Sequence, residues 1–305
     1  MLRFVLSRVA GSLPVLFIIV SLSFFLMRLA PGGPFDQERV LAPQVRANIE
    51  ARYHLDETLW QQYCRYLAAV LHGDLGPSFR YPDRSVNELL ALGLPVSLTL
   101  GAAALLLAIM FGGIAGILAA LRRSSGWDYV TMGLAVGGIS VPNFVLGPLL
   151  VLGFALGLGW LPVAGWGSWR HLVLPACTLA AFYAAYVARL TRAGMLEVIG
   201  QEFIRTARAK GLREARIVLR HALPGAILPV VTYLGPAAAA VLTGSVVVET
   251  IFSVPGIGRY FVASALNRDY TMVLGTVVVY SLLLVLFNLA VDLVIAYLDP
   301  RMRSR

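Results

Sequence analysis

The sequence predicts an all-α polytopic membrane protein of about six transmembrane helices. Of its 305 residues, 58% are hydrophobic and only 13% are charged, which leaves too little polar surface to cover a soluble globule. The apolar residues fall in blocks long enough to cross about 30 Å of hydrocarbon. Because lipid offers no hydrogen bonds to the backbone, and because these blocks are far longer than barrel strands, each block is expected to be a helix.

Six apolar blocks give the expected spans, approximately 9–29, 94–121, 129–158, 171–190, 226–250 and 272–298. The first follows Arg3 and Arg8 as in a signal peptide, but it continues without a small-residue cleavage site and predicts an uncleaved helix. Five prolines are expected to kink the later spans. They are Pro142, Pro148, Pro175, Pro229 and Pro236.

Glycines four residues apart inside the spans predict close helix packing. The two pairs are Gly112 with Gly116 and Gly133 with Gly137. A glycine brings no side chain to the interface, so two helix backbones can approach each other at such positions.

Arginine and lysine gather in alternate loops, and this pattern sets the expected orientation. They lie at the N-terminus, around Arg122, over 189–220 and in the tail after Pro300, whereas the third and fifth loops have few. We therefore expect a multi-pass protein of the bacterial inner membrane with both termini in the cytoplasm. The predicted division is 1–93, an N-terminal transmembrane helix with a periplasmic subdomain that contains a helix near 59–71, and 94–305, a five-helix core with a cytoplasmic loop at 195–224.

Motifs for catalysis or metal binding do not occur in the sequence. Lys210 is the one lysine and does not lie in a P-loop, no HExxH or GxSxG pattern occurs, and the four histidines lack ligand spacing. Cys64 and Cys177 are too isolated to predict a disulfide framework or a thiolate site. We expect no catalytic residue, no metal and no cofactor, and the net charge of +9 predicts contact with membrane lipid and no binding of nucleic acid.

The fourth loop contains two amphipathic segments on either side of Gly211, a natural turn residue. The first apolar stripe is Leu196, Ile199, Phe203 and Ala207. The second is Leu212, Ala215, Leu219 and Ala222, opposite Arg213, Arg216 and Arg220. Pro224 is expected to end the second segment before the fifth span. Two interpretations stay open: helices that lie in the lipid interface beside anionic headgroups, or a surface that contacts a partner.

Part of this loop resembles the coupling loop of binding-protein-dependent ABC transporter permeases. The matching residues are Arg205, Thr206, Ala207, Arg208, Ala209, Lys210 and Gly211, followed by Leu223 and Pro224. The general family pattern has Glu where this chain has Arg205, and the Arg form is similar to the peptide and nickel branch. Other stretches similar to that branch are the opening residues 24–35, residues 54–56, GDLGPSF (73–79), ETIFSVPGIG (249–258), NRDY (267–270) and the terminal residues 299–301.

The resemblance implies a type I ABC importer permease fold and a non-catalytic translocation subunit for oligopeptides. It also implies a heterodimer with a second permease, two ATP-binding-cassette ATPase subunits that drive transport through the coupling loop, and an extracytoplasmic peptide-binding protein that delivers the peptide. Dipeptides and nickel stay open as substrates, because the branch carries these too.

Two acidic residues inside spans, Glu249 and Asp292, are candidates for the translocation path, because a charge in a membrane needs a partner or water. The alternatives are that Glu249 caps the loop at 253–258, and that Asp292 pairs with a basic residue near the cytoplasmic interface. The loop itself, with Pro255 and Gly256, predicts either a gate-proximal element or an ordinary tight turn. An ion-driven secondary transporter is the rival class, but it calls for paired broken helices in inverted repeats, and no internal repeat is evident.

Overall fold

A computed structural model describes residues 2–29, 53–81 and 83–298, without the side chains of 2–4, 242–244 and 296–298. The terminal motif at 299–301 and part of the opening motif at 24–35 lie outside the described residues. The described residues form twelve α-helical segments, two of which continue into π-helical stretches. They are α1 (Leu2–Leu29), α3 (Leu59–Leu71), α4 (Val86–Leu121), α5 (Gly126–Ser140), α6 (Asn143–Leu150) with π-helical Val151–Gly157, α7 (Trp169–Ile199), α8 (Glu202–Ala209), α9 (Glu214–Arg216) with π-helical Ile217–Ala222, α10 (Leu223–Ala226), α11 (Leu228–Ile251), α12 (Ile257–Leu266) and α13 (Tyr270–Leu298).

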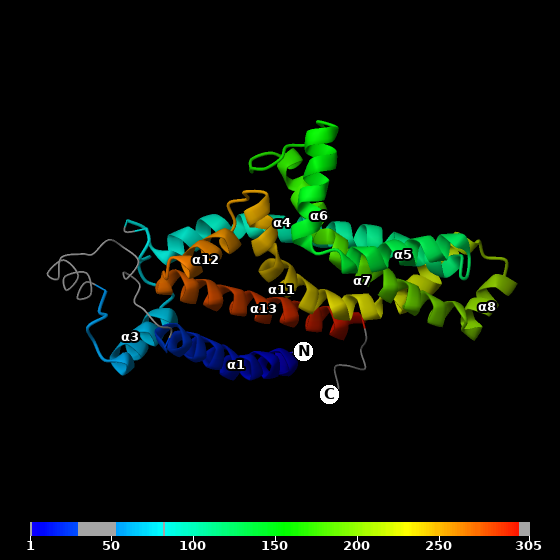
Figure 1. The fold of residues 1–305 in the computed structure, drawn as a ribbon. Helices are drawn as coiled ribbons and strands as arrows, with labels where there is room; N and C mark the ends of the chain where they lie inside the picture. Colours follow the sequence, from blue (N-terminus) through cyan, green and yellow to red (C-terminus); the bar gives the residue numbers. More distant parts are fainter. Residues whose placement is uncertain (1, 30–52, 82, 299–305) are drawn as a thin grey trace.

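The expected all-α fold with about six spans is confirmed. Four single helices are long and apolar enough to cross a membrane, namely Val5–Leu29, Val86–Leu121, Trp169–Ile199 and Tyr270–Ile295. Two bent helix pairs bring the total to six if each pair is one span. Figure 1 shows an elongated bundle in which α3 and α8 lie at opposite ends.

The third span is broken, where the sequence predicted one kinked helix. Gly126–Ser140 and Asn143–Gly157 meet at 109°, and α6 stands out from the bundle (Figure 1). Val141, the residue before Pro142, is extended at φ −87° and ψ 114°, because the proline ring disfavours a helical residue before it. The helix therefore ends at this point and a new one begins.

Two other spans are longer than expected. The second starts at Val86 because the Ser85 hydroxyl caps the helix and accepts a hydrogen bond from Glu88 N–H at 3.2 Å. The fourth continues past residue 190 to Ile199. At 1.5 Å per residue α4 is about 54 Å long, more than the hydrocarbon thickness, so its ends extend beyond the membrane.

The helices α4 and α7 pack closely against each other. A Cβ added to Gly112 would lie 2.4 Å from the Ala184 carbonyl oxygen, and one added to Gly116 would lie 2.5 Å from that of Ala188. This confirms the first predicted glycine pair.

The second predicted pair makes no such contact within the described part of this chain. An added Cβ at Gly133 or Gly137 has no heavy atom within 4 Å among the described residues. The neighbouring Gly138 makes the contact instead, 3.0 Å from the Ala181 carbonyl oxygen, because it occupies the side of α5 that faces α7.

Candidate functional site

The segment from Gln201 to Ala226 is a short helix, a glycine turn and a longer irregular helix at one end of the bundle. The helix α7 ends at Ile199, and α8 runs from Glu202 to Ala209 with Lys210 as its C-cap residue. Gly211 has φ +73°, its N–H donates to Arg208 O at 2.9 Å, and Leu212 N–H donates to Ala207 O at 3.4 Å. This is a Schellman ending, which needs the left-handed conformation that glycine adopts at low cost. The predicted turn at Gly211 is confirmed.

One side of α8 is buried in an apolar cluster made by the ends of the membrane helices. Ile204 is fully buried and Ala207 is nearly so. They share this cluster with residues of four other helical segments. Those residues are Ala120, Met195, Ile217, Val218, Ala222 and Ala226. Through this cluster α8 packs against α4, α7 and the helical segment that leads into α11.

The two apolar stripes expected from sequence are wrong in register. The first divides between α7 and α8 because of the break at Gly200, and Phe203 is 47% exposed. In the second, Leu219 is 63% exposed, and Ala215 is also exposed. The π-helical turn over Ile217–Ala222 has more residues per turn than an α-helix and rotates the buried face toward Ile217 and Val218.

Pro224 does not end the second segment, contrary to expectation. Leu223 and Pro224 lie in α10, which continues the π-helical stretch as far as Ala226. The bend of 55° follows, between Glu214–Ala226 and Leu228–Val241. Pro224 has no N–H for the preceding turn, which accounts for the π-helical turn directly before it.

The opposite side of α8 is polar and exposed. Arg205 Nη1 lies 3.1 Å from Glu202 Oε1 on the same helix. Arg208 Nε lies 2.7 Å from Glu214 Oε1, so that this ion pair bridges the Gly211 turn. Both pairs are exposed and contribute little to stability, but together they define a charged face on an anchored helix.

Gly194 of α7 fixes the distance between this segment and the membrane helices. An added Cβ would lie 2.4 Å from the Ala226 carbonyl oxygen. The two backbones are in direct contact where α10 ends and the bend into α11 begins.

Glu249 lies in α11 and is fully buried. Its carboxylate accepts hydrogen bonds from Ser97 at 2.7 Å, Ser245 at 2.8 Å and Gly258 N–H at 2.9 Å. Ser97 Oγ in turn accepts from Ile257 N–H at 2.9 Å. These contacts hold the N-terminus of α12 and correspond to the capping alternative for Glu249.

Asp292 of α13 pairs with a basic residue, the other alternative given above. Its Oδ2 lies 3.2 Å from Arg8 Nε of α1, and the two side chains are 25% and 53% exposed. This ion pair ties the first span to the last.

Two motifs that are 190 residues apart in the sequence meet at the other end of the bundle. Asp269 is buried. Its Oδ2 accepts a hydrogen bond from Ser78 Oγ at 2.5 Å, and its two oxygens accept from Phe79 N–H and Arg80 N–H at 3.2 Å each. Met272 N–H also donates to Asp269 at 3.2 Å. One carboxylate thus caps α13 and fixes the GDLGPSF loop onto the NRDY turn.

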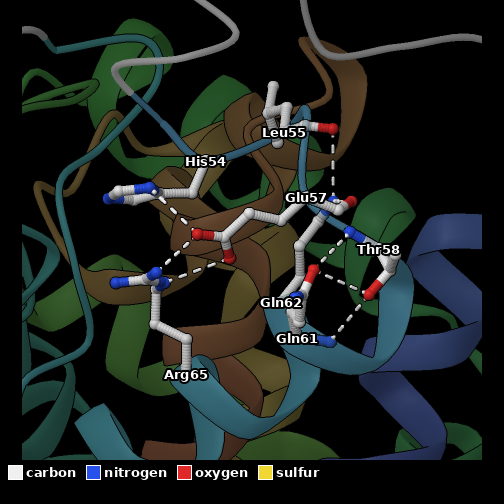
Figure 2. A network of polar contacts seen from close by, with 7 residues as sticks. All are labelled: His54, Leu55, Glu57, Thr58, Gln61, Gln62 and Arg65. Carbon is white, nitrogen blue, oxygen red and sulfur yellow. Dashed lines mark hydrogen bonds and ion pairs between the residues drawn. The ribbon is translucent and has the colours of Figure 1, made fainter.

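The helix expected near 59–71 is confirmed as α3, and Figure 2 shows its N-terminus. Thr58 and Gln61 form a capping box, with Gln61 N–H donating to Thr58 Oγ1 and Thr58 N–H donating to Gln61 Oε1. His54 and Arg65 both approach the Glu57 carboxylate, at 3.3 and 2.5 Å. The hydrogen bond from the Arg65 guanidinium holds the pKa of Glu57 below its usual value.

Sequence reasoning missed one ion pair inside the bundle, between Asp128 at the start of α5 and Arg192 of α7. The contacts are bidentate, Nε to Oδ1 at 2.7 Å and Nη2 to Oδ2 at 2.8 Å. Ser124 N–H also donates to Asp128 at 2.9 Å. Two features of the sequence could have indicated this pair: Asp128 lies three residues after Ser125, as in a helix N-terminus, and Arg192 lies near the end of an apolar block.

Among the described residues, no group of three or more histidines, cysteines or acids could hold a metal ion. Cys64 is exposed, Cys177 is partly buried, and both are free thiols.

Comparison with known proteins gives concordant matches. The family described as "Binding-protein-dependent transport system inner membrane component" matches residues 112–304, and the N-terminal part of such components matches residues 1–83. The chain is 52% identical over 305 residues to the oligopeptide transport system permease protein OppB of Escherichia coli strain K12, over 99% of this chain and 100% of that protein. It is 46% identical over 303 residues to the dipeptide transport system permease protein DppB of Bacillus subtilis strain 168, over 99% of this chain and 98% of that one.

Solved structures with the same fold include the inward-facing MetNI methionine ABC transporter. That chain aligns with a TM-score of 0.59 at 20% identity, over 69% of this chain and 96% of its own length. The likeness shows that the fold is the type I ABC importer permease fold.

Proposed function

The chain belongs to the family of binding-protein-dependent transport system inner membrane components, and we propose that it is the translocation subunit of an ATP-driven importer of oligopeptides. In this proposal the polar face of α8 and the Gly211 turn receive the movement of an ATPase subunit. The membrane helices convert that movement into alternating access for the peptide. The subunit itself is not catalytic, and ATP hydrolysis belongs to its partners.

One observation carries the coupling proposal: the helix with the exposed charged face is anchored by its other face. Ile204 and Ala207 are buried against α4, α7 and the segment that enters α11, while Arg205 and Arg208 are exposed. A push on such a helix moves the membrane helices, because packed side chains transmit displacement. The lipid-interface alternative needs an apolar face toward lipid, and on α8 only Phe203 offers a large one.

We propose nine residues for the coupling contact. They are Arg205, Thr206, Ala207, Arg208, Ala209, Lys210, Gly211, Leu223 and Pro224. The residues before Gly211 offer the surface to the ATPase, together with Glu202 and Glu214. Leu223 and Pro224 act at the bend that leads into α11.

The partners proposed are a second permease in a heterodimer, two ATPase subunits and an extracytoplasmic peptide-binding protein. The sequence identity with an oligopeptide permease and a dipeptide permease supports a peptide as the substrate. The basic residues near α8, and its place at the end of the bundle opposite α3 (Figure 1), support cytoplasmic termini with the α3 subdomain outside. The division into 1–93 and 94–305 is part of the same proposal.

For Glu249 and Asp292 we propose indirect roles beside the translocation path. Glu249 holds the N-terminus of α12 through Gly258, so its hydrogen bonds position the element between the last two spans. Asp292 ties α13 to Arg8 of α1 and keeps the first span on the bundle as the core moves.

Reconstitution tests the energy source. Labelled oligopeptide uptake is measured in liposomes that contain either the complete importer with ATP on the ATPase side or this chain with an ion gradient. We expect uptake with the complete importer and ATP, and none with the single chain. Gradient-driven uptake by the single chain would identify an ion-driven transporter and overturn the proposal.

A further inference from the structure

The helix α7 packs on two neighbours through small residues and leaves another side partly open. Its Ala184 carbonyl oxygen lies against α4, and its Ala181 carbonyl oxygen lies against α5. At 3.6 residues per turn, a different set of residues shares the open side. They are Phe182, Tyr186, Arg189 and Ala193, which follow one another at intervals of three or four residues.

This open side is the floor of a groove between α5 and α11. Met132 of α5 lines a hollow of about 420 Å³ together with Tyr186 and Arg189. On the other side the ring of Tyr233 of α11 stacks on that of Tyr186, with the ring centroids 5.5 Å apart and the planes at 19°. The ring centroid of Phe182 lies 5.0 Å from that of Tyr186. We call these five residues the α7 groove.

The α7 groove differs in polarity from the neighbouring faces that lipid is expected to cover. Leu106 of α4 and Leu134 of α5 are 68% and 72% exposed, as is usual where a helix faces lipid tails. In the groove, Tyr186 and Tyr233 are partly exposed and Arg189 is exposed. Ionisable side chains within membrane spans face the interior of a bundle or a water-filled cavity in most proteins. The groove is therefore expected to face water or a polar partner in the assembled importer.

The groove contains a positive charge that no acid of the described residues compensates. Arg192 lines the same hollow, but its Nε is paired with Asp128 Oδ1 at 2.7 Å. Within residues 53–81 and 83–298, no acidic side chain forms an ion pair with Arg189. Because a charge in a membrane span needs a counter-charge or water, the groove favours an anionic occupant.

The depth of the aromatic residues favours a peptide over a lipid phosphate. Arg189 lies about 30 Å along α7 from Trp169, its first residue, and so near the hydrocarbon boundary at the α8 end of the bundle. A lipid phosphate could meet Arg189 at this boundary. Tyr186 and Phe182 lie about 5 and 10 Å deeper, at 1.5 Å per residue, where lipid offers only hydrocarbon. Their rings, and the tyrosine hydroxyl, suit the amide groups of a peptide.

We propose that the α7 groove is part of the translocation path and binds the peptide in transit, an inference that rests on the proposed function. The Arg189 guanidinium pairs with the C-terminal carboxylate, for which its paired N–H groups are well suited. Tyr186 and Tyr233 contact the peptide backbone. These contacts use groups that every peptide has, so the groove accepts peptides of different sequence.

Photocrosslinking in the complete importer tests the peptide contact. A photoreactive p-benzoylphenylalanine replaces Tyr186, which keeps an aromatic ring at this position, and the importer is illuminated while it transports a labelled peptide with ATP. We expect the label to attach to this subunit. The control has the same photoreactive residue in place of Leu106, on the face of α4 expected to contact lipid, and no attached label is expected.

Uptake is measured in the same vesicles, so that the groove and the proposed function are tested separately. An importer that takes up peptide, but crosslinks position 186 only to lipid or to the second permease, would overturn the groove assignment and leave the proposed function standing. Absence of peptide uptake by the complete wild-type importer would overturn the proposed function, and with it this inference.

Arg189→Gln in the photoreactive importer tests the carboxylate contact. We expect the crosslinking yield of a peptide with a free C-terminus to fall by about tenfold, the effect of losing a charge-assisted hydrogen bond. The yield of the same peptide with an amidated C-terminus is expected to stay unchanged. The matched control is Arg123→Gln, since Arg123 is an exposed arginine at the same end of the bundle and outside the hollow. Any preference of the binding protein cancels, because all variants receive peptide from the same protein. Equal losses for the two peptides, or no loss for either, would overturn the pairing with Arg189.

Discussion

Gly194 of α7 touches the backbone of Ala226, so closely that an added Cβ would lie 2.4 Å from the Ala226 carbonyl oxygen. Ala226 is the last residue of α10, and the chain bends by 55° directly after it. The contact therefore joins a long membrane helix to the point where the α8–α10 segment becomes α11. In the coupling proposal, this is where displacement of α8 reaches two spans together.

Gly194→Ala is expected to destabilise the subunit by about 1–3 kcal/mol, the usual cost of overpacking. The new methyl group would meet backbone, which cannot rotate away. Thermal unfolding of the assembled importer measures this change. Gly113→Ala is the matched control within α4, since an added Cβ there meets nothing within 4 Å, and alanine favours a helix by up to about 1 kcal/mol. Equal unfolding temperatures for the two variants would contradict the close contact.

Asp269→Asn is expected to loosen the GDLGPSF loop. The carboxylate accepts hydrogen bonds from Phe79 and Arg80 N–H groups and from Ser78, and an amide replaces one acceptor oxygen with a donor. Hydrogen exchange at Phe79 and Arg80 is expected to quicken by roughly tenfold or more, since a hydrogen bond to a charged group contributes about 1.5–3 kcal/mol. Asp56→Asn, at an exposed position, is the control and is expected to leave exchange at Phe79 and Arg80 unchanged.

The Asp128 and Arg192 pair is expected to show strong coupling in a double-mutant cycle. Asp128→Asn and Arg192→Gln are each expected to cost about 2–3 kcal/mol. This lies below the range of about 3–5 kcal/mol for a fully buried pair, because the Arg192 side chain is 29% exposed. The double variant is expected to lose less than the sum of the two. Additive losses in chemical unfolding would show that the two side chains do not act together.

Glu57 is expected to titrate below the usual glutamate pKa of 4.5. Its lowered pKa means that the stabilising contact with Arg65 is present above about pH 4.5 and is lost as pH falls through the lower value of the folded protein. Carbon NMR of the labelled carboxylate measures this titration. Arg65→Gln is expected to raise the pKa toward 4.5, whereas Arg170→Gln, far along the sequence on α7, is expected to leave it unchanged.

The spans could be predicted from sequence because apolar length is a strong signal that needs no tertiary context. Pro142 also predicted a kink. The size of the bend, 109°, depends on the helices against which α6 packs, and the pattern of a single sequence does not show those neighbours. For the same reason Gly112 and Gly116 were found as packing residues, while Gly138 was missed beside Gly137.

The two helical segments on either side of Gly211 were predicted from sequence, but the residues on their buried faces were not. A stripe drawn at 3.6 residues per turn assumes one continuous α-helix. The break at Gly200 and the π-helical turn over Ile217–Ala222 both shift the phase, so Ile217 and Val218 are buried where Ala215 and Leu219 were expected. The pair of Asp128 and Arg192, 64 residues apart, depends on the packing of α5 against α7 and could not be read from local spacing.

Peptide uptake by Gly211 variants tests the coupling role most directly. Gly211 has φ +73° and open space around an added Cβ, so a substitution there changes backbone conformation and not packing. In this left-handed conformation Gly211→Val is strained, whereas Gly211→Asn is the matched control, because asparagine adopts the conformation far more readily.

The assembled importer is reconstituted with its ATPases, and oligopeptide uptake and ATP hydrolysis are measured together. We predict that Gly211→Val assembles and hydrolyses ATP but takes up much less peptide per ATP, while Gly211→Asn stays close to the wild type. Normal uptake per ATP by an assembled Gly211→Val importer would contradict the coupling role of this segment.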